Sequence, residues 1–539
     1  MSTTEETRPE VRNPHRAPVA WSRWYWSAGF VIAGLLLFVA YLRQAWTTNV
    51  NSDGAGNALQ AWDMLHGNVL LRGWTVTDIS FYTIQLPELA VAEALHGLTP
   101  GVLHITSALN YTLIVLGVAI LARGDQRGRA GVVRALIGAG IMLAPTLGAS
   151  TTAMLHDPDH TAIQIPLLAV WFLLDWDETR TVARWGVPVG VGALLLWAQI
   201  ADSITLYEGA APLVLVCAIR MYRARELRRR ELSLVAASLV ATGIAELVLK
   251  FIRHVGGFVL LQPQSTFYPI RFLYQNVWGM VEDLLTLFGA DFSGDQVGAS
   301  ALVPLLHLVG VALAGWALVR AFRGFGQHGL AVQVLAVTSV VVLVAYVLRD
   351  QSGGGPHEMV GVLVACSVLA GRLLAEPLIR GRHLTVFALV LVFYAGCLGY
   401  NATQPAVVQD QSTQLATWLN DHGLTSGLAP YWEADSVTFD SQNRVTVAPV
   451  ILNQAGELIG VNRASETAWF DPARYDARFV VVSPESLGCT GGSTAQWLAA
   501  VRTQFGAPAR SYQVGEFQVL VWNQNLLNNL QEAAPGDTC

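Results

Sequence analysis

Three short polar segments, each beside an apolar run, contain the residue types that can carry out a group transfer. In the first, Asp53 follows the apolar run 30–40 by about a dozen residues. We expect this carboxylate at the membrane surface, facing water or a cavity, because an unpaired acid in lipid is costly. The segment 54–66 spaces its apolar residues as an amphipathic helix, so Asp53 also suits the N-cap of that helix. The two roles are compatible.

The second segment, HDPDH at 156–160, combines two imidazoles with two carboxylates. Its residues His156, Asp157, Asp159 and His160 are of the types that hold a divalent cation, or a phosphate through one. The alternative is structural. In that case Asp157 and Pro158 form a turn and Asp159 caps the next helix.

The third segment, RDQSGGGPHE at 349–358, places Arg349, His357 and Glu358 around three consecutive glycines. Arg349 and His357 suit the phosphate of a lipid, since both can donate hydrogen bonds and carry positive charge. The alternative is a tight connection between two spans, with the Arg349 side chain reaching to the interface.

Aromatic residues of the loop that follows Asp53 could stack on the faces of a sugar. The candidates are Trp62, Trp74 and Tyr82. Tryptophan and tyrosine are also enriched at membrane interfaces, where they anchor the protein, so the aromatic residues alone do not distinguish the two roles.

The composition is that of a multi-span membrane protein. Of the 539 residues, 53% are hydrophobic and 13% are charged, and the mean hydropathy is +0.42, which is too apolar for a soluble chain. The net charge is −6 and the arginines lie in short clusters. No broad basic face is therefore expected, which argues against binding to nucleic acid.

The apolar runs predict about eleven membrane spans and a defined orientation. The runs are 26–44, 102–122, 132–150, 160–175, 186–201, 209–221, 232–252, 299–321, 329–348, 359–376 and 382–400. With residues 1–25 as a disordered cytoplasmic tail, every second loop is rich in arginine, as the positive-inside rule requires. All three polar segments then share the outer face of the membrane. Lys250 is the sole lysine among the 33 basic residues, a bias typical of a high-GC bacterium, so this membrane is expected to be a bacterial cell membrane.

The predicted fold class is an α-helical polytopic membrane protein with a small C-terminal extracytoplasmic α/β domain. The transmembrane domain covers 26–400, with outer loops at 45–101 and 253–298, and the outer domain covers 401–539. Within 401–539 we expect helices at 413–420 and 494–505 and strands within 436–450, at 479–483 and at 513–523. Within the 253–298 loop, 271–287 is predicted to be a second interfacial helix. Cys489 and Cys539 would share an oxidising compartment and could pair.

This layout resembles the GT-C membrane glycosyltransferases. The sharper similarity lies in NSDGAGNALQAWDMLHGN, GWTVTDISFYTIQLPE, HDPDH and GGGPHEMVGVLVACSVLAGR, which look like segments of bacterial membrane proteins of this superfamily. The Trp-Trp-Asp motif of oligosaccharyltransferases is absent, and Tyr431-Trp432-Glu433 does not replace it. The resemblance therefore does not extend to transfer onto asparagine.

The resemblance implies a role for each polar segment. Asp53 matches the catalytic carboxylate of the first outer loop, and Asp157 with Asp159 matches the Asp-x-Asp element that serves a divalent cation such as Mg²⁺ or Mn²⁺. The phosphate-binding residues fall on Arg349 or His357, with Glu358 beside them. The donor would be a polyprenyl-phosphate-linked sugar in the lipid membrane, and the acceptor a hydroxyl of a cell-envelope glycan or lipid.

Two other classes of protein remain open from the sequence. A transporter or flippase of lipid-linked intermediates would need charged or broken helices at the membrane midplane. The nearest candidates are Glu246 and Lys250, which lie close to the end of a span. A non-catalytic cell-envelope assembly protein would use its outer domain to bind a polymer or a partner.

Overall fold

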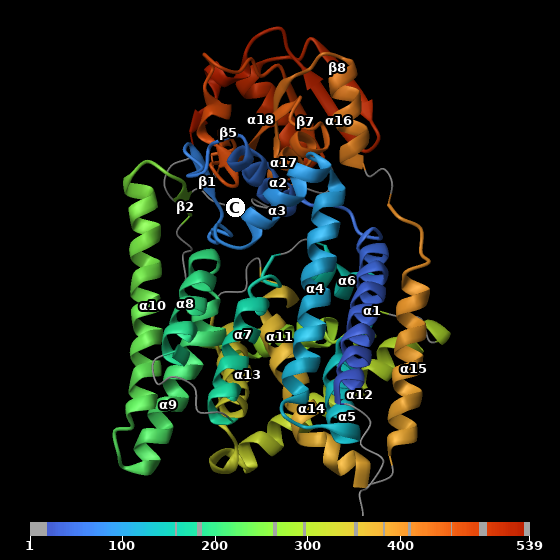
Figure 1. The fold of residues 1–539 in the computed structure, drawn as a ribbon. Coiled ribbons are helices and arrows are strands. Elements are labelled where there is room, and N and C mark those ends of the chain that lie inside the picture. The colour runs from blue at the N-terminus through green and yellow to red at the C-terminus, as the bar shows by residue number, and fades with distance from the viewer. Residues whose placement is uncertain are drawn as a thin grey trace, which may run out of the picture.

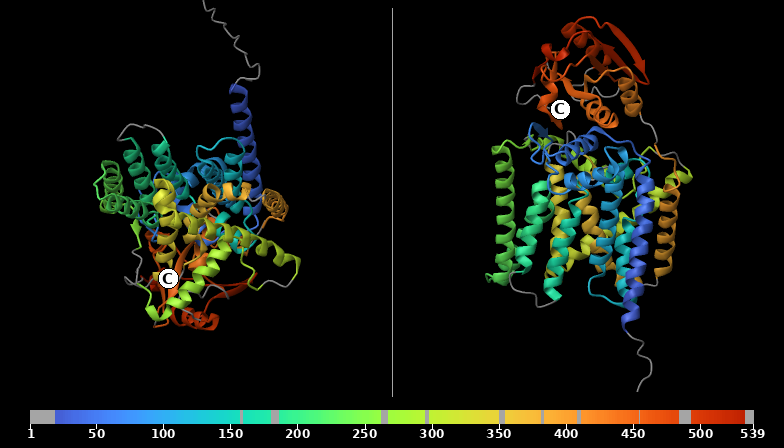
Figure 2. Two further views of the ribbon diagram at one scale, coloured as in Figure 1. Left: turned by 90° about the horizontal axis from the view of Figure 1, so that it is seen from below. Right: turned by 45° about the horizontal axis from the view of Figure 1, so that its top comes forward.

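The structure, a computed structural model, describes residues 19–156, 159–179, 186–261, 267–294, 298–349, 354–380, 383–407, 411–453, 455–483 and 493–532. A bundle of long helices carries a smaller, sheet-containing domain on one end (Figure 1). The N-terminal end of the first helix lies at the opposite end of the bundle (Figure 2). A helical bundle with a small C-terminal domain of helices and strands agrees with that part of the predicted fold class.

The bundle is built from helices of very different length. They are α1 (Val19–Ala45), α4 (Pro100–Arg123), α5 (Gly128–Ile141), α6 (Ala149–Leu155), α7 (Gln164–Thr179), α8 (Gly186–Ala201), α9 (Ala211–Ala224), α10 (Arg229–His254), α12 (Ala299–Arg323), α13 (Leu330–Leu348), α14 (Val360–Arg380) and α15 (Leu384–Asn401). In the described part of the chain, seven of these regions are long and apolar enough to cross a membrane, those of α1, α4, α10 and α12 to α15.

Each of the eleven predicted spans contains a helix, but four of these helices, α5, α7, α8 and α9, have only 14 to 16 residues. The predicted span 132–150 is wrong in its second half. Its helix ends at Ile141, and α6 begins only at Ala149. Pro145 cannot donate a backbone hydrogen bond, and Gly148 has φ +84°, a conformation that interrupts a helix.

Short elements cover the end of the bundle that carries the sheet-containing domain. They are α2 (Ser52–Leu65), β1 (Trp74–Val76) and α3 (Gln85–His96) from the first loop, and β2 (Val259–Leu260), the 3₁₀ turn η2 (Ile270–Phe272) and α11 (Leu273–Leu287) from the 253–298 loop. Two short segments complete the bundle. One is the π-helix η1 (Leu206–Ala210) after α8, and the other is the 3₁₀ turn η4 (Pro356–Met359) before α14. The helices predicted at 54–66 and 271–287 are therefore present.

The C-terminal domain contains a seven-stranded mixed sheet. Its strands are β3 (Ser426–Pro430), β4 (Thr446–Leu452), β5 (Leu458–Gly460), β7 (Phe479–Val482), β8 (Arg510–Val514), β9 (Phe517–Val521) and β10 (Gln531–Glu532), in the order β10-β5-β4-β3-β7-β9-β8. Strand β3 is central and parallel to both neighbours, with Leu428 opposite Ala448 on one side and Val480 on the other. Helices α16 (Gln411–Asp421), α17 (Tyr431–Asp440) and α18 (Thr494–Phe505) complete the domain.

Two predictions within this domain are wrong in part. The single strand predicted at 513–523 is instead the end of β8 and the whole of β9, which form an antiparallel hairpin that turns at Gly515. Residues 436–450 were expected to be strands, but the first part lies in helix α17 and only β4 is extended. The residues from Glu433 to Phe439 are all buried, as are those of β4, so the alternation in the sequence marks no exposed face and does not distinguish helix from strand here. Helix α17 is enclosed between the sheet and the first loop.

The C-terminal domain is joined to the first loop by backbone and side chains. Strand β1 pairs with β2 and with β6 (Ser465–Glu466), so that Thr75 lies opposite both Val259 and Ser465. The rings of Trp74 and Trp469 meet edge to face at 5.5 Å, within one hydrophobic core that continues from the loop into the domain. This shared core holds α17 against α2.

Candidate functional site

Asp53 lies in the first turn of α2, but it is not the N-cap. The cap is Asn51, whose side chain accepts a 2.9 Å hydrogen bond from the backbone N–H of Gly54. The backbone N–H of Asn51 in turn donates to Nε2 of His156 at 3.1 Å. Because the cap is supplied by another residue, the Asp53 carboxylate remains available for other contacts.

The C-terminal domain supplies the partner of Asp53. The hydroxyl of Tyr431 donates a 2.5 Å hydrogen bond to Oδ1 of Asp53. Burial raises the pKa of Asp53, although the Tyr431 hydrogen bond and the positive charge of Arg463 act in the opposite direction. The charges of Asp159 and His357 also act on this carboxyl. The first loop, the 156–160 segment and η4 therefore converge at one place.

Two further groups of the C-terminal domain surround this carboxyl, and the sequence analysis missed both. The guanidinium of Arg463 lies over the ring of Tyr431, 5.0 Å from its centroid. Asp435 is fully buried, and among the described residues neither of its oxygens has a hydrogen-bond partner. Burial and the charge of Asp53 hold the pKa of Asp435 well above its usual range. Arg463 and Asp435 belong to no sequence motif, so nothing in the sequence indicated that they would lie near Asp53.

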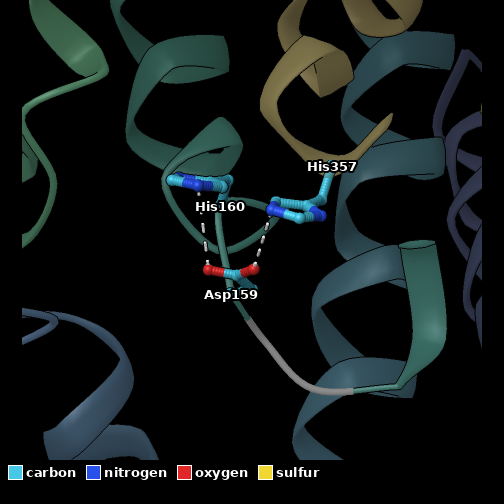
Figure 3. A group of neighbouring side chains, drawn as sticks. All are labelled: Asp159, His160 and His357. Atoms are coloured by element: carbon cyan, nitrogen blue, oxygen red, sulfur yellow. Dashed lines mark ion pairs between the residues drawn. The ribbon is translucent and has the colours of Figure 1, made fainter. Parts of the chain in front are cut away.

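Asp159, His160 and His357 form a cluster whose ligand atoms lie within 4.8 Å of one another. Asp159 points one oxygen at each histidine, 3.9 Å from Nε2 of His160 and 3.8 Å from Nε2 of His357 (Figure 3). The two imidazole rings stack with centroids 5.3 Å apart and planes 10° apart. The group has the composition of a metal site with two histidines and one carboxylate.

A buried carboxylate orients His160. Oδ2 of Asp202, directly after α8, lies 2.5 Å from Nδ1 of His160, and its side chain is completely buried. Burial by itself lowers the pKa of His160, but the charges of Asp202 and Asp159 raise it well above its usual value. With Nδ1 engaged, Nε2 faces Asp159 and is the nitrogen that could bind a cation. A carboxylate behind a ligating histidine is a recurrent feature of metal sites.

His156, predicted as a metal ligand, does not belong to this cluster. His156 is buried, its Nε2 is occupied by Asn51, and burial lowers its pKa to about 4. It is therefore a neutral side chain that supports the start of α2. Asp157 lies outside the described residues, as do Cys489 and Cys539.

Arg349 and Glu358 form an ion pair beside His357. Arg349 follows the end of α13, and Glu358 lies in η4, where its carboxylate accepts a hydrogen bond from the guanidinium. The Arg349 side chain is 49% exposed, whereas that of Glu358 is 10% exposed. Glu358 therefore holds an accessible arginine in place.

The three aromatic candidates have partners of their own. Trp74 is buried and donates from its indole N–H to Asp63 at 2.8 Å. The hydroxyl of Tyr82 donates to the carbonyl of Val69 at 3.0 Å, and its ring packs against that of Phe258. Trp62 packs on His66 with ring centroids 4.3 Å apart. Trp74 thus belongs to the hydrophobic core and bonds Asp63, and none of its described partners is Asp53, Asp159 or His357.

Comparisons with solved structures identify proteins that share this fold. No family model and no curated protein matches the sequence. Among solved structures, ArnT from Cupriavidus metallidurans bound to undecaprenyl phosphate superposes with a TM-score of 0.55 at 13% identity, over 92% of this chain and 98% of that one. Its apo state gives 0.55 at 14% identity, over 95% and 100%.

An oligosaccharyltransferase from Archaeoglobus fulgidus, tethered with an acceptor peptide, gives a TM-score of 0.51 at 13% identity, over 89% of this chain and 72% of that one. The chain is therefore a multi-pass membrane protein that shares its fold with ArnT and with this oligosaccharyltransferase. At these identities the comparison defines the fold, and the assignment of a reaction rests on the site.

Proposed function

We propose that this protein is a membrane glycosyltransferase that moves a sugar from a polyprenyl-phosphate donor to an acceptor hydroxyl. The observation that carries this proposal is the convergence of three separate segments: Asn51, two residues before Asp53, bonds His156 at 3.1 Å, and Asp159 lies 3.8 Å from His357. A general base beside a group that can hold a cation, Asp159, His160 and His357, suits a reaction in which a hydroxyl attacks a carbon bonded to a phosphate. The shared fold with ArnT, which was captured with undecaprenyl phosphate, supports this donor class.

Asp53 is proposed as the base that takes the acceptor proton. The acceptor oxygen forms a bond to the anomeric carbon while its hydrogen passes to a carboxylate oxygen of Asp53. The bond between the anomeric carbon and the phosphate oxygen breaks, and its electron pair leaves with the lipid phosphate. A base is more effective when its pKa approaches the working pH, so the raised pKa of Asp53 favours this role.

The phosphate that leaves carries negative charge that must be stabilised. Arg349 is an accessible arginine whose ion-pair partner, Glu358, is next to His357 in the sequence. A guanidinium can bind phosphate oxygens through two parallel N–H groups. Glu358 would then orient Arg349 without touching the donor.

The donor set of Asp159, His160 and His357 fits a divalent cation. Nδ1 of His160 is held by Asp202, which leaves Nε2 for the cation, and the three ligand atoms are already close. A cation bound there would help to neutralise the donor phosphate. Two imidazole nitrogens favour an ion such as Zn²⁺ over Mg²⁺ or Mn²⁺.

The orientation proposed from the arginine distribution puts this site on the outer face of the bacterial cell membrane, with the N-terminus in the cytoplasm. A lipid-linked donor suits that face, because the sugar arrives attached to its carrier and no nucleotide is needed. The C-terminal domain, which contributes Tyr431, would then cover the site from outside.

The test is transfer by the purified full-length protein in lipid nanodiscs. A panel of polyprenyl-phosphate sugars is incubated with cell-envelope glycan, and release of free polyprenyl phosphate is measured. We expect one donor to be consumed, and Asp53→Asn to lower turnover by about 100-fold or more with little change in donor binding. Asp63→Asn, on the same helix but bonded to Trp74, is the matched control and should keep turnover within about threefold of wild type. Equal turnover of wild type and Asp53→Asn would contradict the proposal.

A further inference from the structure

Glu208 is a buried carboxyl that the proposed chemistry does not use. It lies in the π-helix η1, whose wide turn is closed by the N–H of Ala211 bonding to the carbonyl of Leu206. Such turns are uncommon, are inserted at some cost, and are frequent at functional sites. Glu208 itself is 1% exposed.

The Glu208 side chain connects two helices. Its Oε2 accepts a 2.6 Å hydrogen bond from the side-chain amide of Gln164, the first residue of α7. Its Oε1 accepts a 3.1 Å hydrogen bond from the backbone N–H of Gly361, in the first turn of α14. The backbone carbonyl of Glu208 also accepts a 2.9 Å bond from the hydroxyl of Thr338 in α13. One residue therefore links three helices.

The two helices joined by this carboxyl are those that follow the paired histidines. Gln164 comes four residues after His160, and Gly361 comes four residues after His357. Because each imidazole lies directly before its helix, the relative position of the two helix starts sets the separation of the stacked rings. A bond from one carboxyl to both helix starts limits how far the rings can move apart.

Gly361 is required for this contact by space and not by backbone conformation. A Cβ atom at this position would lie 2.3 Å from Oε1 and 2.5 Å from Cδ of Glu208. Any other residue would push the carboxyl away from the α14 backbone. The close approach is thus specific to the pair formed by Gly361 and Glu208.

The segment from 202 to 208 acts on His160 twice. Asp202 holds the ring of His160 through Nδ1, and Glu208 holds the helix that follows it. The carboxylate of Asp202 also accepts a 2.9 Å bond from the N–H of Ile204, which fixes the start of the same segment. Two acids on one short segment therefore control the ring and the helix separately.

We propose that Glu208 is a positioning residue that holds His160 and His357 at the spacing a shared cation requires. This inference rests on the cation site of the proposed function. Supporting groups behind metal ligands typically change metal affinity by 10- to 100-fold when they are removed.

The experiment uses Co²⁺ alone as the probe, titrated into the full-length protein in nanodiscs and followed by its visible absorption. We expect Glu208→Ala and Gly361→Ala to weaken Co²⁺ binding by about tenfold or more and to alter the absorption bands. Glu208→Gln should stay within about threefold of wild type. Its amide oxygen can still accept from Gly361, and its NH₂ can donate to Oε1 of Gln164, which is buried and has no hydrogen-bond partner in the described chain.

Glu231→Ala is the matched control for loss of a buried acid. Glu231 is also buried, but it pairs with Arg220 at 3.2 Å in another part of the bundle. The Glu231→Ala substitution should lower the melting temperature without changing the affinity for Co²⁺. Unchanged Co²⁺ affinity in folded Glu208→Ala and Gly361→Ala would overturn the positioning role.

A second measurement separates this inference from the proposed function. If wild type and a His160→Ala, His357→Ala double variant bind Co²⁺ equally, the cation site itself is refuted. The spacing is then measured in membranes through His160→Cys and His357→Cys, joined by methanethiosulfonate crosslinkers of graded length. Glu208→Ala should reduce the yield with the shortest linker at least fivefold, and an unchanged yield would refute the positioning role directly.

Discussion

The hydroxyl of Tyr431 and the carboxylate of Asp53 are joined by a 2.5 Å hydrogen bond across 378 residues of chain. Asp53 lies in the first turn of α2, which follows α1, and Tyr431 begins helix α17 of the C-terminal domain. The proposed base is therefore completed by a domain that is separate from the bundle in sequence. The contacts of β1 with β6 and of Trp74 with Trp469 hold the two partners together.

Tyr431→Phe should make the proposed transfer activity more sensitive to acid. Asp53 acts as a base only when deprotonated, so activity is lost as the pH falls through its raised pKa. The Tyr431 hydrogen bond lowers that pKa, so its removal moves the acid limb of kcat/KM to higher pH. A shift of about one unit would cost about tenfold at low pH and little at high pH.

The pH profile of Tyr431→Phe is compared with that of Tyr512→Phe, a change on β8 of the same domain. The second variant should follow the wild-type profile, because Tyr512 packs against Trp418 and not against Asp53. A Tyr431→Phe acid limb that coincides with wild type would show that this hydrogen bond does not tune the base.

Arg349→Ala should weaken donor binding. The half-exposed guanidinium is the proposed contact to the lipid phosphate, and a hydrogen bond to a charged group contributes about 1.5–3 kcal/mol. We expect the donor Kd to rise by roughly 10- to 100-fold. Arg271→Ala is the control, because Arg271 is exposed and stacks on Phe272. Equal affinity of Arg349→Ala and wild type would remove Arg349 from the donor site.

The orientation can be checked with reporter fusions at the C-terminus. The arginine-rich loops predict that residue 539 lies outside the cytoplasm, so an alkaline phosphatase fusion there should be active. A green fluorescent protein fusion at the same position should be dark. Fluorescence with an inactive phosphatase would reverse the orientation and place the site on the cytoplasmic face.

Glu93→Gln should stabilise the protein, and more so at alkaline pH. Glu93 in α3 is 1% exposed, and among the described residues neither carboxyl oxygen has a hydrogen-bond partner. Burial raises its pKa from 4.5 to about 9. The folded state therefore keeps a proton that the unfolded state loses, and stability falls as the pH rises from 4.5 to about 9.

The melting temperature of Glu93→Gln should exceed that of wild type by a few degrees at pH 8 and by less at pH 5. The amide keeps the size of the side chain but does not ionise. Glu457→Gln, an exposed change in the C-terminal domain, should leave the difference between the two pH values unaltered. A Glu93→Gln melting temperature that tracks wild type at both pH values would contradict the burial argument.

The sequence alone was enough to predict the class of the protein and the elements that carry the polar segments. Long apolar runs favour membrane helices because backbone groups in lipid must bond within their own segment. Each of the eleven apolar runs contains a helix, and seven described helices are long and apolar enough to cross a membrane. The amphipathic helices α2 and α11 followed from periodicity. The boundary of the predicted span 132–150 was wrong, because Pro145 and Gly148 interrupt its apolar run.

The composition of the site was decided by tertiary structure. Local spacing grouped four residues of HDPDH, yet His156 supports Asn51 while His160 meets His357, nearly two hundred residues later. Asp202, Tyr431, Asp435 and Arg463 lie in segments that carry no motif. They become part of the site only because the C-terminal domain packs on the first loop and because α8 ends beside α7. Such contacts depend on how whole elements pack, and short-range sequence patterns do not encode them.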